Sequence, residues 1–346
     1  METTSTRPTG RSFRMLGPAL ASMAMACASL NAHAVLTLNA AGIAEGFALS
    51  TFYTDPGANL GLIDAVNAPD GSIIGSGYGR GQVFKFPDID GQSFGSALLS
   101  ATPGGTPTGI ASVGGHVYVG LLGGSYYDVN TTTLSFTQVA LSGTVNARYG
   151  LWGNQTNGHL LASTTQGLLD INPLTGTFTT VGLPPGNTDG VTISPDGSIV
   201  YNETNSTSIF GYSLLSPDPT VPVFSATGLP GGPDGTGIIS GGLLNGDIVV
   251  NNNDGTVGVI DKLTGIETII ATGGSRGDLV GPDGSNGTLL LSSTDQMYRL
   301  SCGANCAIGS VPVVPEPTTV ALLGVGLAGL WLRRRTARRD TAARLV

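Results

Sequence analysis

The sequence predicts an all-β protein whose main part is a β-propeller, with six blades and with seven as the alternative number. A unit of about 43 residues recurs six times between residues 35 and 313, and two separate landmarks keep this period. In addition, Gly makes up 54 of the 346 residues and charged residues make up only 11%. That composition argues against a coiled coil or a helical bundle.

The first landmark is a glycine turn that follows the opening run of each unit. Glycine accepts the positive φ that tight hairpins need, so such a turn marks the link between two antiparallel strands. The opening runs are Gly61-Leu62, Gly109-Ile110, Gly150-Leu151, Gly190-Val191, Gly237-Ile238 and Asp278-Leu279. The turn glycines are Gly71, Gly115, Gly158, Gly197, Gly246 and Gly287.

The second landmark is the end of another β-rich run, which follows a polar break. It falls at Phe86, Val129, Ile171, Tyr212, Ile260 and Leu300. Successive turn glycines are 44, 43, 39, 49 and 41 residues apart, and successive run ends are 43, 42, 41, 48 and 40 residues apart. Both landmarks place the one long unit at the same step, which favours propeller blades over the alternatives, a β-sandwich array or a β-solenoid.

The segment before the first unit, residues 46–54, alternates apolar with small or polar residues. We expect it to pair with the last blade and close the ring, because closure hides exposed strand edges. In their turns and strand rhythm the units resemble the NHL, YVTN and gluconolactonase-like propellers. The lactonase-like members place a divalent ion in the propeller channel, although the Glu and Asn that they use have no matched positions here.

Residues 1–34 are predicted to be a secretory signal peptide. Three arginines precede the apolar stretch 15–30, and Ala32 and Ala34 form an Ala-x-Ala cleavage signal. We therefore expect export through the Sec translocon and cleavage after Ala34. The alternatives are an uncleaved membrane helix and a lipid anchor on Cys27.

The C-terminal segment has three parts in a fixed order. These are Pro315, Glu316 and Pro317, then the apolar run 320–332, then Arg333, Arg334 and Arg335. Thirteen helical residues rise about 20 Å, less than the ~30 Å of a bilayer core, so the run predicts one short, marginal transmembrane helix. The positive-inside rule places the arginines and the tail 340–346 in the cytoplasm and the propeller outside.

Residues 314–339 resemble the PEP-CTERM sorting signal of Gram-negative bacteria. The resemblance implies an exosortase as partner, a membrane cysteine protease-transpeptidase that cleaves near Pro-Glu-Pro. It also implies transient anchoring in the inner membrane, a final location at the cell surface or outside the cell, and a host that makes exopolysaccharide or biofilm matrix.

Charge and cysteine content agree with an exported domain. Residues 35–314 hold six basic and twenty acidic residues, a net charge of −14. Such a surface disfavours nucleic acid as a partner. Two cysteines remain after signal cleavage, Cys302 and Cys306, and in an exported chain this close pair predicts a disulfide rather than a metal site.

Four aspartates are the main candidates for a functional site. Asp64, Asp189, Asp234 and Asp278 lie at or near the start of the first run of their units. In a propeller the first strand lines the channel, so these carboxylates are predicted to meet at one mouth, where Ca²⁺ could balance their charge. The alternative is four solvent-exposed turn residues. No cofactor is otherwise indicated.

Catalytic motifs based on histidine are missing from the sequence. His116 and His159 each follow a turn glycine and are predicted to be hairpin residues, and no Gly-x-Ser-x-Gly or His-Glu-x-x-His occurs. We expect a non-enzymatic binding or structural propeller that contacts exopolysaccharide or another surface partner. Candidate stacking residues are Tyr126, Tyr127, Tyr149 and Trp152. The alternative function is a divalent-metal-dependent lactonase or hydrolase.

Overall fold

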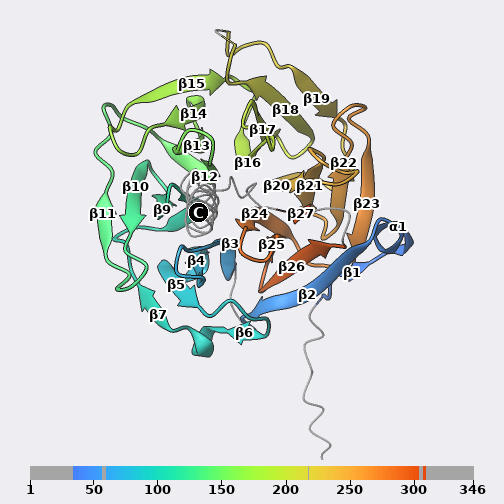
Figure 1. The fold of residues 1–346 in the computed structure, drawn as a ribbon, viewed down its shortest axis with the longest axis horizontal. Helices are drawn as coiled ribbons and strands as arrows, with labels where there is room; N and C mark the ends of the chain where they lie inside the picture. The colour runs from blue at the N-terminus through green and yellow to red at the C-terminus, as the bar shows by residue number, and fades with distance from the viewer. Residues whose placement is uncertain (1–33, 57–59, 217, 304–306, 309–346) are drawn as a thin grey trace, which may run out of the picture. The chain divides into compact units, whose positions relative to one another are not determined.

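The computed structural model describes residues 34–56, 60–216, 218–303 and 307–308, and in these residues the chain forms a six-bladed β-propeller (Figure 1). The inner strand of each blade packs against the inner strands of both neighbouring blades. The contacts run from blade to blade and return from the sixth blade to the first, so the ring is closed and the predicted number of six is confirmed.

The first five blades are four-stranded antiparallel sheets whose strands run in sequence from the channel outward. Their strands are β3 (Leu62–Asn67), β4 (Ile73–Gly77), β5 (Gln82–Phe86) and β7 (Leu99–Ala101); β8 (Pro107–Val113), β9 (His116–Leu121), β10 (Ser125–Val129) and β11 (Phe136–Gln138); β12 (Ala147–Asn154), β13 (His159–Thr164), β14 (Gly167–Ile171) and β15 (Phe178–Gly182); β16 (Thr188–Ile193), β17 (Ile199–Thr204), β18 (Ser208–Ser213) and β19 (Phe224–Thr227); and β20 (Pro233–Ser240), β21 (Ile248–Asn252), β22 (Val257–Ile260) and β23 (Glu267–Thr272). Both sequence landmarks fall where expected, because every run end lies on the third strand of a blade and every turn glycine has a positive φ, between 62° and 89°.

The sixth blade is built from both ends of the propeller sequence. It contains β24 (Gly277–Asp283), β25 (Thr288–Ser293) and β26 (Gln296–Cys302), and β2 (Phe47–Thr54) supplies its outer strand. β2 runs antiparallel to β26, with Leu49 opposite Leu300, which confirms the predicted closure of the ring.

Short elements cover the remaining strand edges near this closure. β1 (Thr37–Leu38) pairs with β23 of the fifth blade, and the short helix α1 (Ala40–Ala44) connects it to β2. β6 (Gln92–Ser93) runs parallel to β2, and β27 (Ala307–Ile308) pairs with the end of β20. Two further single turns of 3-10 helix span Tyr78–Arg80 and Phe94–Ser96.

Glycines bring the inner strands into backbone contact. A Cβ on Gly150 would overlap the carbonyl oxygen of Asp189, and a Cβ on Gly190 would overlap that of Asp234. Because no side chain fits between these strands, the residues beside the glycines are held at a fixed position along the channel. This geometry positions the acidic residues described below.

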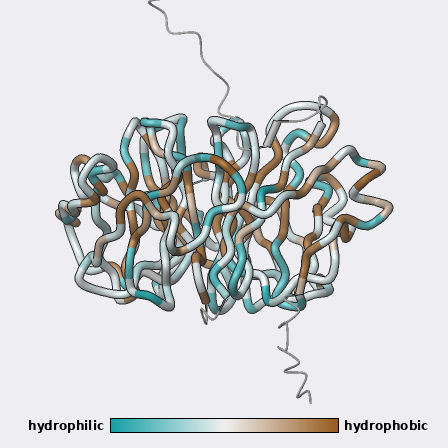
Figure 2. The backbone as a smooth tube through the Cα atoms, turned by 90° about the horizontal axis from the view of Figure 1, so that it is seen from below, coloured by the Kyte–Doolittle hydropathy of each residue, from teal (hydrophilic) through white to brown (hydrophobic). Residues whose placement is uncertain are grey.

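The apolar core lies between neighbouring blades. One cluster joins blades three to six and others join blades two and three, six and one, and one and two. In Figure 2 the brown apolar segments follow the middles of the strands and the teal segments gather in the turns.

Arg299 on β26 forms a buried ionic cluster that ties the last blade to the first. Its Nη2 donates to Asp88 Oδ1 at 2.7 Å and its Nε donates to Asp90 Oδ1 at 2.9 Å. Its Nη1 donates to Asp283 on β24. Asp88 and Asp90 lie in the loop between β5 and β6, so one guanidinium binds three carboxylates from two blades.

Several predicted features lie outside the described residues, namely the signal peptide up to residue 33, the sorting segment 314–339 and Cys306. Cys302 is disulfide-bonded, and its pairing with Cys306 stays a prediction. Among the described residues, no helix has the length and apolar character needed to cross a membrane.

Candidate cation site at the acidic mouth of the channel

The four predicted aspartates all lie near the beginning of inner strands. Asp64 is the third residue of β3, and Asp189, Asp234 and Asp278 are the second residues of β16, β20 and β24. We call this end of the channel the acidic mouth.

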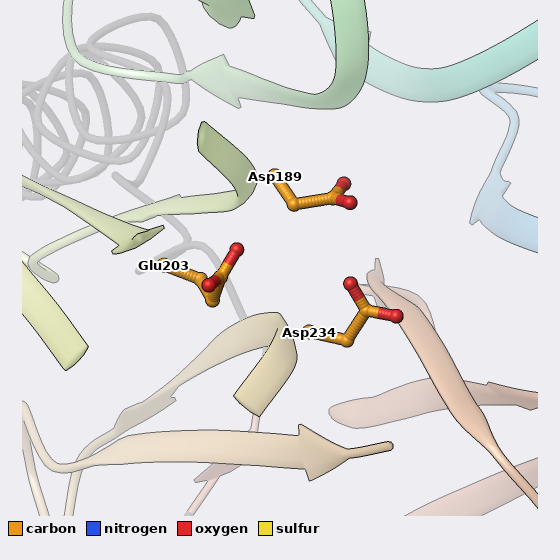
Figure 3. A group of neighbouring side chains, drawn as sticks. All are labelled: Asp189, Glu203 and Asp234. Atoms are coloured by element: carbon orange, nitrogen blue, oxygen red, sulfur yellow. The ribbon is translucent and has the colours of Figure 1, made fainter. Parts of the chain in front are cut away.

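Two of these aspartates converge with a third acid that the sequence analysis did not select. Asp189, Glu203 and Asp234 each offer one carboxylate oxygen, and the three oxygens lie within 4.8 Å of one another. Figure 3 shows the three side chains pointing toward a common space from three different strands. Glu203 reaches it because β17 is antiparallel to β16, so that Thr204 lies opposite Thr188 and the end of β17 lies beside the start of β16.

Burial makes the ionised forms of these carboxyl groups costly. Glu203 is 2% exposed and Asp234 3% exposed. Burial, followed by the charge of Asp234, raises the pKa of Asp189 well above its usual range. Burial raises the pKa of Glu203 to about 8, with a further increase from Asp234 and a decrease from the Ser206 backbone N–H. Without a cation, Glu203 is therefore mostly protonated at neutral pH, and ionisation of Asp189 is disfavoured.

Asp278 and Arg276 lie next to the three acids. Arg276 Nη2 is 3.0 Å from Asp234 Oδ2 and 3.7 Å from Asp278 Oδ2, and Arg276 Nε donates to Asn253 Oδ1 at 2.8 Å. Burial and the charge of Asp234 raise the pKa of Asp278 to about 7, whereas Arg276 lowers it. One guanidinium thus pairs with two carboxylates, Asp234 and Asp278, in a group of four acids, which leaves an excess of negative charge when all of them ionise.

Asp64 has different surroundings from the other three. Its Oδ2 accepts a hydrogen bond from Ile110 N and its Oδ1 one from Ala65 N, both at 2.9 Å. It does not belong to the three-acid group, and its bond to Ile110 joins the first blade to the second. Burial raises its pKa well above the usual range, and the two backbone N–H groups oppose that effect.

Two cavities adjoin the cluster. One, of about 300 Å³, is lined by Tyr149, Asp189, Glu203 and the loop residues beside them. The other, of about 200 Å³, is lined by Tyr78, Tyr149, Asp189, Arg276 and Asp278 among others. The rings of Tyr78 and Tyr149 lie 6.1 Å apart, so the space next to the carboxylates has an aromatic wall.

The donor set fits a hard cation. All three converging ligands are carboxylate oxygens, which Ca²⁺ and Mg²⁺ prefer and which suit Zn²⁺ less well than imidazole or thiolate. Asp189 Oδ1 is buried and has no hydrogen-bond partner among the described residues. A buried carboxylate oxygen normally has a partner, so this atom is a candidate metal ligand.

Glu203 and Arg276 were not among the residues predicted from the sequence, although the sequence contains a signal for each of them. Glu203 is an ionisable residue within the strand-forming run 199–204, and antiparallel pairing places the end of that run beside the start of the previous one. Arg276 directly precedes β24, two positions before Asp278. Neither position shows by itself which acids meet across blades.

The other candidate residues have varied positions. Tyr126 is fully buried and cannot stack on a ligand, and Tyr127 packs edge-on against Phe136. His116 and His159 begin strands β9 and β13 and pair with Asp128 and Asp170 on the adjacent strand, as expected for hairpin residues. Trp152 lies near the other end of the inner strand β12.

Comparison with solved structures identifies the fold. The propeller is similar to a gluconolactonase from Xanthomonas campestris, with a TM-score of 0.58 and 14% identity over 77% of this chain and 94% of that one. It is also similar to a presumed gluconolactonase, with a TM-score of 0.62 and 15% identity over 79% and 99%. The third similar structure is a protein of unknown function from Bacteroides thetaiotaomicron. Its TM-score is 0.57 and its sequence identity is 12%, over 74% of this chain and 76% of that one. At these identities the likeness shows the propeller fold alone.

Sequence comparison identifies the C-terminal segment. The search of curated proteins found no match. Residues 313–339 match the model of the PEP-CTERM protein-sorting motif, which implies an exported, membrane-anchored precursor with an exosortase as its processing partner. The chain therefore carries a PEP-CTERM sorting motif behind a six-bladed β-propeller.

Proposed function

We propose that this protein is a surface-displayed binding propeller that holds Ca²⁺ at its acidic mouth and there contacts a hydroxyl-rich ligand such as exopolysaccharide. The convergence of Asp189, Glu203 and Asp234 carries the proposal. Burial and the charge of Asp234 oppose ionisation of Asp189 and Glu203, and a divalent cation bound among the carboxylates would offset that penalty.

The surroundings of the cluster support ligand binding beside the cation. The two adjoining cavities provide space next to Asp189, and Tyr149 lines both of them. Sugar hydroxyls are neutral oxygen ligands, which Ca²⁺ accepts together with carboxylates. Export and surface sorting, which the motif at residues 313–339 implies, would bring the propeller into contact with extracellular polysaccharide.

Calorimetric titration with Ca²⁺ tests the cation site. We expect one ion per chain with a Kd on the order of 10⁻⁴ M, as for extracellular calcium modules. Asp189→Asn should weaken binding at least about tenfold, because it removes one charged ligand. The matched control is Asp261→Asn, which removes one surface charge from a turn where the third blade has Asn172 at the equivalent position. Equal affinity of both variants would contradict the proposal.

A pull-down with the polysaccharide of the producing organism tests the ligand. Retention that disappears with EDTA and returns with Ca²⁺ is expected. Absence of retention in both conditions would contradict the glycan part of the proposal.

A metal-dependent lactonase is the second candidate, and the pKa of Asp278 near 7 favours it. A carboxyl group with this pKa suits general-base catalysis at neutral pH. A bound cation would polarise a lactone carbonyl. Asp278 would then take a proton from water as the water oxygen bonds to the carbonyl carbon. It would return that proton to the ring oxygen as the ring C–O bond breaks, which gives the hydroxy acid. Hydrolysis of gluconolactone above the uncatalysed rate, lost in Asp278→Asn, is the expected result; no turnover with Ca²⁺ or Mn²⁺ would exclude it.

A further inference from the structure

The opposite end of the channel holds a cavity of different chemistry. Its volume is about 380 Å³, and it is lined at the C-terminal ends of the six inner strands and in the loops that follow them. No ionisable residue lines it among those that the structure describes, although the domain between residues 35 and 314 has a net charge of −14. We call this end the neutral mouth.

Two amide groups, one on the half-buried Asn67 and one on the buried Asn154, are oriented by the backbone at this mouth. Asn67 Oδ1 accepts a hydrogen bond from Gly284 N at 2.9 Å, and Asn154 Oδ1 accepts one from Thr156 N at 3.0 Å. These bonds assign the oxygen of each amide, so each Nδ2 is the remaining donor. Both residues line the cavity, and Asn154 is only 2% exposed.

Within the described parts of the chain neither amide nitrogen has a hydrogen-bond partner, and neither belongs to the fully buried unpartnered atoms, so both are open to the cavity. An amide donor held in this way can donate to water or to an acceptor of a ligand in the cavity. Trp152 contributes an aromatic wall to the same cavity, and Ser112 and Ser240 also line it.

We propose that the neutral mouth is a second binding site, which takes an uncharged polyhydroxylated ligand, namely a neutral sugar residue. A sugar hydroxyl accepts from an amide donor and donates to a hydroxyl or carbonyl oxygen, and its C–H face packs on an aromatic ring. Anionic sugars fit less well because the cavity offers no cation to balance a carboxylate. The volume lies within the range of small-molecule sites.

This site is independent of the proposed cation site. The acidic mouth lies at the beginnings of the inner strands and the neutral mouth at their ends. Binding at the neutral mouth therefore needs no Ca²⁺, which separates a failure of this inference from a failure of the proposed function.

Tryptophan fluorescence of the full chain tests the inference. The chain has two tryptophans, Trp152 and Trp331, so Trp331→Phe leaves Trp152 as the sole reporter beside the cavity. The probes are methyl α-glucoside, methyl α-mannoside, methyl α-galactoside and N-acetylglucosamine, with glucuronate as the anionic comparison. We expect a saturable change with at least one neutral probe, with a Kd on the order of 1 mM.

Two variants in different blades examine the amides separately. Asn67→Asp and Asn154→Asp keep the acceptor oxygen but replace the Nδ2 donor with a negative charge, so each should weaken the neutral sugar at least about tenfold. The control is Asn172→Asp, since the fifth blade has Asp261 with the same backbone bonds at the equivalent turn. Thermal melting checks that each variant is folded.

The outcomes are distinct. Saturable binding of a neutral sugar that resists EDTA and is lost in a folded Asn67 or Asn154 variant supports the inference. It is overturned if no neutral probe changes the emission up to about 50 mM, if the folded variants bind like the parent, if glucuronate binds as tightly as the neutral sugars, or if EDTA abolishes the signal.

Discussion

The proton-holding carboxyl groups at the acidic mouth predict an unusual dependence of stability on pH. The experiment compares the stability of the protein between pH 5 and pH 9 in the presence of EDTA, which removes divalent cations. The pKa of Glu203 is about 8 in the folded protein and 4.5 in its ordinary state. The unfolded chain therefore releases this proton first, and the folded state loses relative stability as the pH rises through 8.

The size of the effect follows from the same pKa values. A difference of one pKa unit corresponds to about 1.4 kcal/mol, so Glu203 alone accounts for a loss of about 5 kcal/mol at most. The stabilising contribution is complete below pH 4.5 and absent above pH 8. Ca²⁺ requires the ionised carboxylates, so it should stabilise the protein more at pH 9 than at pH 5. At a concentration of 100 times its Kd, bound Ca²⁺ adds about 2.7 kcal/mol to the free energy of unfolding.

Urea denaturation at pH 5, 7 and 9, with EDTA and with Ca²⁺, measures both effects. Glu203→Gln is the matched variant, since its side chain has nearly the same shape and does not titrate, and its stability should depend much less on pH. The reasoning is refuted if the protein in EDTA is as stable at pH 9 as at pH 5. It is also refuted if Glu203→Gln shows the same slope as the parent.

Three further predictions concern closure, packing and sorting. Arg299→Gln leaves Asp88, Asp90 and Asp283 without their common partner and should cost about 3–5 kcal/mol in urea denaturation. The comparison is Asp70→Asn, which weakens the pair of Lys85 with the exposed Asp70 and should cost less than about 1 kcal/mol. Equal losses would contradict a role of Arg299 in closure. Gly190→Ala should lower the melting temperature strongly, because the added Cβ meets the backbone of the fifth blade. Gly95→Ala is the control, since open space surrounds Gly95, and it should leave the melting temperature nearly unchanged. A similar melting temperature for both variants would argue against backbone contact at the channel. Mass spectrometry should find the mature protein without Arg333–Arg335, and replacing Pro315–Pro317 with alanines should leave the tail attached in cells that contain an exosortase; an unprocessed wild-type tail in such cells would contradict the sorting prediction.

The sequence by itself determined the repeat, the number of blades and the sorting motif, because each depends on local signals. A turn glycine such as Gly71 fixes a hairpin through its own positive φ, and its recurrence counts the blades. The segment around Leu49 was recognised as the closing strand from its alternation and its place before the first unit. The match at residues 313–339 likewise depends on residues that are consecutive in the chain.

Only the tertiary structure decided which acids face one another. Asp64 and Asp189 occupy similar positions in their units, yet backbone N–H groups satisfy Asp64, while Asp189 meets Glu203 and Asp234. The difference arises from antiparallel pairing within the fourth blade and from the backbone contact of its inner strand with that of the fifth blade. The neutral mouth was hidden for the same reason, since all six inner strands contribute to its lining and no single unit contains it.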